Sequence, residues 1–288
     1  MSLSVATLNI LDDLAFWPER APLILEGFDA LRPHVIALQE VSLATPSVSL
    51  QGARSTAHWL ADRLGGYSVT FCPRTAHPAS DSLAILTSLP IESHSILELE
   101  GEGRQAQRID VRLGREQWTV VNTHLYWNPL HEAVRVDQVR QLLVWLDGVR
   151  PAVVCGDFNA LPASRTLDRF GEHLTSAHLA RHGKDPLLTY PTMLRRGPGL
   201  RHWGRHSALR ANGLMRLRRN MRFVGTVDYI MTDKDVQVES CDVILSGPSR
   251  TDPMIYASDH FGLSAVLDHP DAVPPMWDST GPLEGRGD

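Results

Sequence analysis

The run Ala152–Cys155 is apolar throughout and is followed directly by Gly156-Asp157-Phe158-Asn159. A continuous apolar run of this kind is typical of a strand buried on both faces of its sheet, so other layers must cover that sheet. The first polar residues after such a strand lie at the edge of the sheet, where layered folds bind their ligands. The run therefore predicts a layered fold with Asp157 and Asn159 at a candidate site, although residues of this type also form simple turns.

Five more strand-like runs carry polar residues at one end. Because a compact fold brings several strand ends to one edge, we expect these polar side chains to meet. The residues are Asn9 after 4–8, Glu40 after 35–39, His124 after 118–123, Asp228 at the start of 228–230, and Asp259 with His260 before 263–267.

Taken in order, these segments resemble the motifs of the endonuclease/exonuclease/phosphatase superfamily, whose members are metal-dependent phosphoesterases with a DNase-I-like fold. The resemblance spans about residues 4–268. Leu11 stands where the apurinic-endonuclease branch has an acid, and the Trp-Cys-Asp-Arg signature of inositol polyphosphate 5-phosphatases is missing, so both branches are disfavoured. The motifs are Thr7-Leu8-Asn9, Leu38-Gln39-Glu40-Val41, Asn122-Thr123-His124-Leu125, Gly156-Asp157-Phe158-Asn159, Asp228-Tyr229-Ile230 and Ser258-Asp259-His260.

The resemblance implies an α/β (α+β) fold, a four-layer α-β-β-α sandwich of two mixed, mainly antiparallel sheets. Helical spacing of apolar residues predicts one helix between Pro18 and Pro33 and another that ends before Gly148. Period-two alternation and apolar runs predict further strands, and the turn Gly114-Arg115-Glu116 indicates an antiparallel pair. These strands cover 67–73, 82–88, 93–100, 107–113 and 237–245.

Oxygen ligands at the predicted site suit a hard divalent cation. Glu40 is a ligand of the type that Mg²⁺ or Mn²⁺ prefers, with Asn9 and Asp259 as neighbours. Asp157 and Asn159 could hold a second ion or orient the attacking water, and the sequence leaves one and two metals equally open.

The superfamily assigns further roles to the matching residues. It pairs Asp228 with His260, which keeps that imidazole in one orientation, and it makes His124 a donor to the scissile phosphate. Asp157 then aligns the water and takes its proton, while Asn159 and His260 contact the non-bridging oxygens. For His260 alone, a histidine hydrogen-bonded at a strand start is the simpler interpretation.

Residues 1–268 are expected to form a single catalytic domain and 269–288, rich in Pro, Gly and Asp, a disordered tail. No run approaches the roughly 18 apolar residues of a membrane span, and the amino terminus has no basic-then-apolar leader. Cys72, Cys155 and Cys241 are expected to be free thiols. We therefore expect a cytoplasmic monomer.

An Arg-rich segment at about 186–227 contains nine arginines and no Asp or Glu, in a chain of net charge -5. Clustered guanidinium groups attract phosphates, so this insertion predicts an anionic partner, with Arg222 as a substrate-binding candidate close to Asp228. The alternative is a solvated helical face.

The sequence His124-Leu125-Tyr126-Trp127-Asn128-Pro129 resembles the deadenylase and oligoadenylate-phosphodiesterase branch. Tyr126 and Trp127 are candidates for stacking on bases, which suits single strands, although one of the two is as well explained by packing the helix at 131–147 onto the sheet.

The chain is therefore predicted to be a metal-dependent nuclease or phosphodiesterase acting on single-stranded nucleic acid or nucleotides. The alternatives are a phospholipid or inositol-phosphate phosphoesterase of sphingomyelinase type, whose Arg-rich segment would face anionic lipid, and a non-catalytic scaffold.

Overall fold

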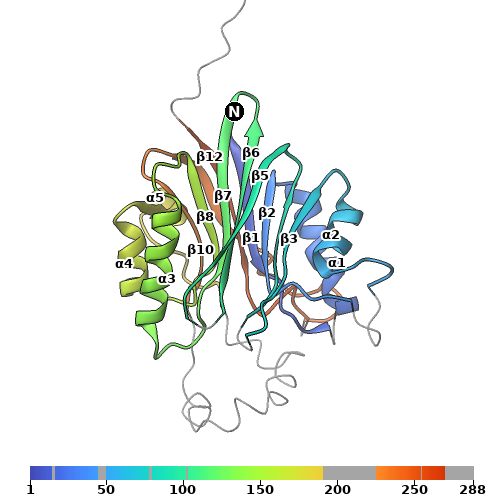
Figure 1. The fold of residues 1–288 in the computed structure, drawn as a ribbon. Coiled ribbons are helices and arrows are strands. Elements are labelled where there is room, and N and C mark those ends of the chain that lie inside the picture. The colour runs from blue at the N-terminus through green and yellow to red at the C-terminus, as the bar shows by residue number, and fades with distance from the viewer. Residues whose placement is uncertain are drawn as a thin grey trace, which may run out of the picture.

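Two six-stranded sheets pack face to face in the computed structural model (Figure 1), which describes residues 1–14, 17–44, 50–77, 80–101, 103–190, 225–253 and 255–269. The first sheet has the order β11-β12-β1-β2-β4-β3 and the second β5-β6-β7-β8-β10-β9. The strands of the first are β1 (Leu3–Asn9), β2 (Val35–Gln39), β3 (Ser68–Cys72), β4 (Leu83–Thr87), β11 (Gln237–Ile244) and β12 (Gly262–Asp268). The strands of the second are β5 (Ile91–Glu98), β6 (Gln105–Leu113), β7 (Glu116–His124), β8 (Ala152–Asp157), β9 (Leu174–Ser176) and β10 (Asp228–Asp233).

Helices cover the outer faces of both sheets (Figure 1). The pair α1 (Trp17–Leu31) and α2 (Thr56–Leu64) lies on the first sheet, and α3 (Glu132–Trp145) with α4 (Arg165–Gly171) lies on the second. The short α5 (Ala177–His182) contacts β10 and β11. The predicted four-layer sandwich and both predicted helices are confirmed. The sequence patterns did not predict α2, α4, α5 and β9. Elements α4, α5 and β9 are too short to show periodicity, whereas α2 has an apolar face with Trp59, Leu60 and Leu64 that was overlooked.

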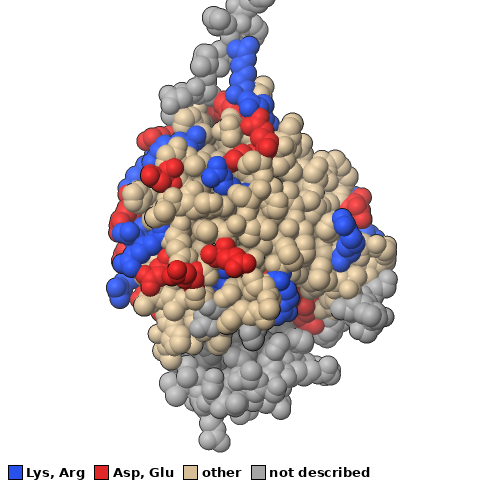
Figure 2. Space-filling model, viewed as in Figure 1, with Lys and Arg blue, Asp and Glu red and all other residues tan. Residues whose placement is uncertain are grey.

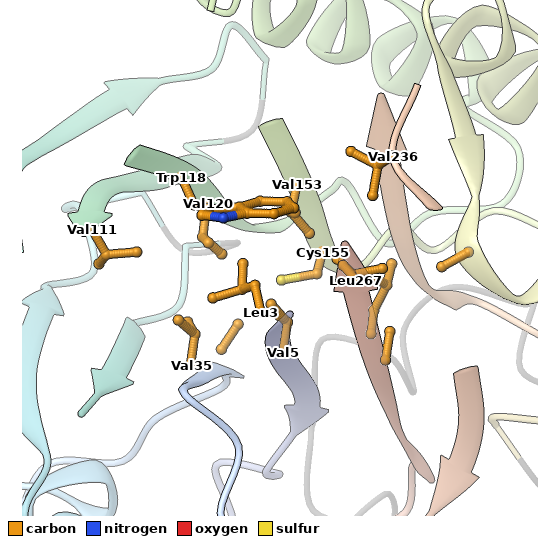
Figure 3. Close-up of a cluster of buried hydrophobic side chains, with 14 of the residues drawn as sticks. Leu3, Val5, Val35, Val111, Trp118, Val120, Val153, Cys155, Val236 and Leu267 are labelled. Carbon is orange, nitrogen blue, oxygen red and sulfur yellow. The ribbon is translucent and has the colours of Figure 1, made fainter. Parts of the chain in front are cut away.

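Three apolar clusters hold the four layers together. The central one lies between the sheets and includes Leu3, Val35, Trp118 and Cys155 (Figure 3). The other two join each sheet to its own helices. Strands β2, β4 and β8 are buried along their whole length and β1 at every residue except Ser4, which explains their largely apolar sequences.

Strand direction decides which residues meet. The neighbours β1 and β2 are parallel, as are β7 and β8, whereas β12 runs antiparallel to β1 and β10 antiparallel to β8. The carboxyl ends of the four parallel strands therefore lie at the same edges as the amino ends of β10 and β12. These ends lie at the end of the sandwich opposite the amino terminus (Figure 1).

Two fully buried amides connect the sheets just inside that end. Gln39 of the first sheet donates from Nε2 to Oδ1 of Asn122 in the second, at 2.7 Å. Asn122 Nδ2 donates in turn to the carbonyl oxygens of Leu38 (2.9 Å) and Ala84 (3.1 Å). Since buried amides are costly when unpaired, these bonds favour one alignment of the sheets.

Charged side chains are unevenly distributed on the face shown in Figure 2. They gather over α3 and α4, whereas the middle of this face is largely uncharged. The edge strand β3 has no charged residue, and β5 has only Glu92 and Glu98. Among the residues described on this face there is no basic stripe of the kind that tracks a nucleic-acid backbone.

Several sequence predictions fall partly or wholly outside the described residues. These include most of the Arg-rich segment with Arg222, and the predicted tail after residue 269. Within the described ranges, no helix combines the length and the apolar character that a membrane span requires. Cys72, Cys155 and Cys241 are buried free thiols, as predicted.

Gly156 is required where β7 and β8 meet. Its φ is +138°, and a Cβ at this position would lie 1.9 Å from the backbone oxygen of Thr123.

We expect Gly156→Ala to lower the free energy of unfolding by about 3 kcal/mol or more, because backbone atoms cannot move aside easily. Urea denaturation measures the change. As a control, Gly171→Ala introduces a Cβ with no heavy atom within 4 Å, so its effect should be within about 0.5 kcal/mol. Equal stability of the two variants would contradict this account.

Candidate active site

Three of the predicted residues meet where Asp157 contacts two histidines. Asp157, the last residue of β8, lies between two imidazoles: its Oδ2 is 3.3 Å from Nε2 of His124 and 3.7 Å from Nε2 of His260. The three side chains are buried. Burial alone would raise the pKa of Asp157, but the two cationic rings outweigh that effect and hold the pKa well below its usual range.

Each imidazole is held from behind by a second carboxylate. Nδ1 of His260 is 2.9 Å from Oδ2 of Asp228, and Nδ1 of His124 is 2.7 Å from Oδ2 of Asp81. Burial would lower the pKa of His124, but Asp81 dominates and raises it to about 10. Asp228 and Asp157 likewise raise the pKa of His260 well above its ordinary value, against the effect of burial. Both rings are therefore cationic at neutral pH.

Arg104 completes a row of side chains with alternating charge. Its Nη1 donates to Oδ1 of Asp81 at 2.8 Å, and its side chain is 5% exposed. The row contains three anions and three cations, all clustered at the strand ends. In order it runs Asp228, His260, Asp157, His124, Asp81 and Arg104.

The sequence did not predict Asp81 or Arg104. Both occupy the type of position that revealed the other residues, since Asp81 lies two residues before β4 and Arg104 directly precedes β6. A search for polar residues at the starts of all strands, as well as at their ends, would have found them.

A group of carboxylates lies next to this row, around Glu40. Asn9 Nδ2 donates to Glu40 Oε1 at 3.0 Å and also to Asp157 Oδ2 at 3.2 Å. Burial and the nearby Asp12 raise the pKa of Glu40 to about 7, and Asp259 adds to this effect while His124 opposes it. This group carries excess negative charge on hard oxygen atoms, so its residues fit a divalent cation such as Mg²⁺ or Mn²⁺.

A second group could also hold an ion. Asp157, Asp228 and His260 each offer one ligand atom, and these atoms lie within 4.8 Å of one another. Here, however, a cationic imidazole already contacts both carboxylates, and it neutralises much of their charge. Around Glu40, by contrast, Asp12, Asp259 and Asp81 all raise the pKa of Glu40 and His124 opposes them, so electrostatics favour this group as the metal site.

Three further predicted residues, Asn159, Tyr126 and Trp127, lie just beyond the ends of β8 and β7. Asn159 donates from its backbone N–H to Asp157 Oδ1 (2.9 Å) and from Nδ2 to the Leu125 carbonyl (3.1 Å). Tyr126 is only 6% exposed and packs in the interior, whereas Trp127 is half-buried. Tyr190, which the sequence did not indicate, packs against the His260 ring with centroids 4.7 Å apart.

Comparison with known proteins identifies the class. Residues 6–260 match the model of the Endonuclease/Exonuclease/phosphatase family, and the chain therefore belongs to that family. Its curated relatives include human nocturnin, 26% identical over 274 residues that cover 86% of this chain and 57% of nocturnin. The Candida albicans CCR4-Not complex 3'-5'-exoribonuclease subunit Ccr4 is 33% identical over 85 residues, 24% of this chain and 11% of Ccr4. This chain thus spans little more than half the length of nocturnin.

Solved structures show the same fold. The human nocturnin catalytic domain with bound sulfate aligns with a TM-score of 0.66 and 22% identity, covering 93% of each chain. D. rerio TDP2 complexed with a single-strand DNA product aligns with a TM-score of 0.69 and 14% identity, covering 93% of this chain and 99% of TDP2. The predicted superfamily and fold are confirmed, and the relatives agree with the predicted position near the deadenylase branch. Family membership supports phosphodiesterase or nuclease chemistry.

The raised pKa of Glu40 predicts how stability depends on pH. A carboxyl group whose pKa is raised on folding binds its proton more tightly in the folded state. Its contribution is therefore complete below its ordinary pKa of 4.5 and is lost as the pH rises through about 7. For the metal-free protein we expect a loss of about 1–3 kcal/mol from this group between pH 5 and pH 8. His124 acts in the same direction as the pH rises from 6.5 through about 10.

Urea denaturation across this pH range, in EDTA and in Mg²⁺, measures the effect. Mg²⁺ should restore stability at the upper end, because a bound cation replaces the proton as the partner of Glu40. The matched variant Glu40→Gln lacks the titrating group, so its stability should depend less on pH. Identical pH profiles for wild type and Glu40→Gln in EDTA would be inconsistent with a half-buried Glu40 whose pKa is raised.

Proposed function

We propose that this chain is a divalent-metal-dependent phosphodiesterase that hydrolyses phosphoester bonds in single-stranded nucleic acid or nucleotides by in-line attack of water. The observation that supports it best is the position of Asp157 between two cationic imidazoles, beside the carboxylates around Glu40. Such a site combines an acceptor for the proton of water with donors for a phosphate.

The two imidazoles bind the phosphate. Because Nδ1 of His260 is held by Asp228 and Nδ1 of His124 by Asp81, the Nε2 atoms of both rings face Asp157 Oδ2, at 3.7 and 3.3 Å, where they would also reach a phosphate bound against Asp157. Non-bridging phosphate oxygens placed there accept these hydrogen bonds, which strengthen as negative charge develops. The positive charge on both rings is maintained by their buried carboxylate partners.

Asp157 orients the water. Its low pKa makes it a weak base toward free water, so it first accepts a hydrogen bond that points the water oxygen at phosphorus. The proton moves to Asp157 as the new phosphorus–oxygen bond forms and the water becomes acidic. The phosphorus–oxygen bond on the opposite side breaks at the same time, and the leaving alcohol oxygen takes up a proton from solvent. Asn159 fixes Asp157 through its backbone N–H, and its own position is fixed by the Leu125 carbonyl.

Glu40, with Asn9 and Asp259 beside it, would hold the metal ion. When bound, a divalent cation supplies Lewis-acid stabilisation of the phosphate charge and of the leaving oxygen. Asn9 donates to both Glu40 and Asp157, so it couples the metal ligand to the residue that orients the water.

Three observations support a nucleic-acid or nucleotide substrate. The partly exposed Trp127 lies three residues after His124, where it could stack on a base. One relative is named as an exoribonuclease, and a protein of the same fold was solved with a single-strand DNA product. We assign Arg222 a substrate-binding role on its sequence position alone. Residues 1–268 would act as one monomeric catalytic domain, and the buried free thiols fit the reducing cytoplasm.

The test is a time course on 5′-labelled single-stranded RNA with Mg²⁺, Mn²⁺ or EDTA. We expect metal-dependent cleavage that Asp157→Asn lowers by at least about 1,000-fold, since the variant no longer accepts the proton. Asp29→Asn is the matched control, because Asp29 lies on the surface of α1 and is 65% exposed. Full activity of Asp157→Asn would refute the assignment. Intact RNA with head-group release from anionic liposomes would identify a lipid phosphoesterase instead.

A further inference from the structure

The loop between β7 and α3, residues 125–131, is attached at its start to the catalytic strand. The Leu125 N–H donates to the carbonyl of Asp157 at 2.9 Å, and the Leu125 carbonyl accepts from Asn159 Nδ2 at 3.1 Å. The loop therefore keeps a fixed position relative to the residues that orient the water.

A side chain from the first turn of α3 holds the backbone of this loop at residues 126–128. Arg135 is 4% exposed, and its Nη1 donates to the carbonyls of Tyr126 at 3.1 Å and Asn128 at 2.7 Å. These two residues flank Trp127. Gln138, fully buried one turn further on, accepts from the Tyr126 N–H at 3.0 Å and donates to the Gly101 carbonyl at 3.1 Å. The backbone on both sides of Trp127 is thus held by α3.

Trp127 itself is half-buried and lies edge-on to Tyr126, with ring centroids 6.0 Å apart. A ring with a fixed backbone and a buried aromatic neighbour has little freedom to rotate. A surface that is already ordered loses less conformational entropy when a ligand binds to it.

We propose that Arg135 is a positioning residue for substrate recognition: it holds Trp127 as a fixed stacking surface for a nucleobase next to the scissile phosphate. This inference rests on the proposed function and adds a determinant of specificity to it. Arg135 makes its contacts with loop carbonyls, so it acts through Trp127.

A purely structural role explains Arg135 less well. Among the described residues, its buried Nε has no hydrogen-bond partner. A buried guanidinium group with an unpaired donor contributes little net stability, and an unbranched apolar side chain of similar length fills the same space. Arg135→Met is therefore expected to fold, with a melting temperature lowered by only a few degrees because the carbonyls of Tyr126 and Asn128 lose a donor.

The experiment compares a single-stranded oligonucleotide with an abasic oligonucleotide of the same length, in Mg²⁺. We expect Arg135→Met to raise KM for the base-bearing substrate by about tenfold, the size of one lost stacking contact, with little change for the abasic one. Arg140→Met is the matched control, since Arg140 lies on the same helix, is 55% exposed and pairs with Asp137. Arg140→Met should leave KM unchanged for both oligonucleotides.

A double-mutant cycle tests whether Arg135 acts through Trp127. If it does, Arg135→Met has no further effect on KM once Trp127→Ala is present. Additive effects of the two substitutions, or equal losses on both substrates, overturn the inference and leave the proposed function intact. A wild-type protein that hydrolyses neither oligonucleotide overturns the proposed function and the inference with it.

Discussion

The hydrogen bond between Gln39 and Asn122 is the interaction on which the geometry of the site depends. The reacting groups come from two separate sheets, with Glu40 on one and His124 and Asp157 on the other. A sliding movement of one sheet over an apolar interface would cost little in buried area, because the hydrophobic effect has no direction. The hydrogen bonds of the buried amides are directional, so they oppose sliding of one sheet over the other. Gln39 directly precedes Glu40 and Asn122 lies two residues before His124, so the same bonds set the distance between these site residues.

Most charged side chains of the site are paired with a side chain of opposite charge, which makes their burial less costly. In the row from Asp228 to Arg104, each buried ion has a partner of opposite sign, which offsets the cost of removing it from water. The excess negative charge is confined to Glu40 and its acidic neighbours, where burial pushes the pKa of Glu40 up to about 7. A phosphate and a divalent cation would meet complementary parts of one site, the imidazoles and the carboxylates respectively. This separation follows from the residues themselves and agrees with the chemistry that the family supports.

The resemblance to the superfamily implied the four layers. Local sequence patterns predicted the two long helices and the polar residues at the ends of buried strands. The predicted bounds of β3, β4 and β11 lie within one residue of the observed bounds. Strand β5 is displaced by two residues, because pairing with β6 rather than side-chain type sets its end. Asp81 and Arg104 were missed because their importance arises only when β4 and β6 bring them beside His124. The sequence also did not predict that Tyr126 is buried and Trp127 only half-buried. Two adjacent aromatic residues have similar sequence signals, and their burial depends on how the loop packs. Sequence patterns thus locate strand ends, and the packing of the layers decides which side chains meet.

The most direct test of this account is the charge state of the two imidazoles that flank Asp157. Nitrogen chemical shifts of ¹⁵N-histidine, assigned with His124→Gln and His260→Gln, report whether each ring is cationic. The account predicts that both rings keep imidazolium shifts from pH 5 to pH 8, and that Asp81→Asn lowers the pKa of His124 much more than that of His260. If either ring loses its proton near its ordinary pKa of 6.5 in the wild type, the alternating row of charges is not formed and the proposed site is wrong.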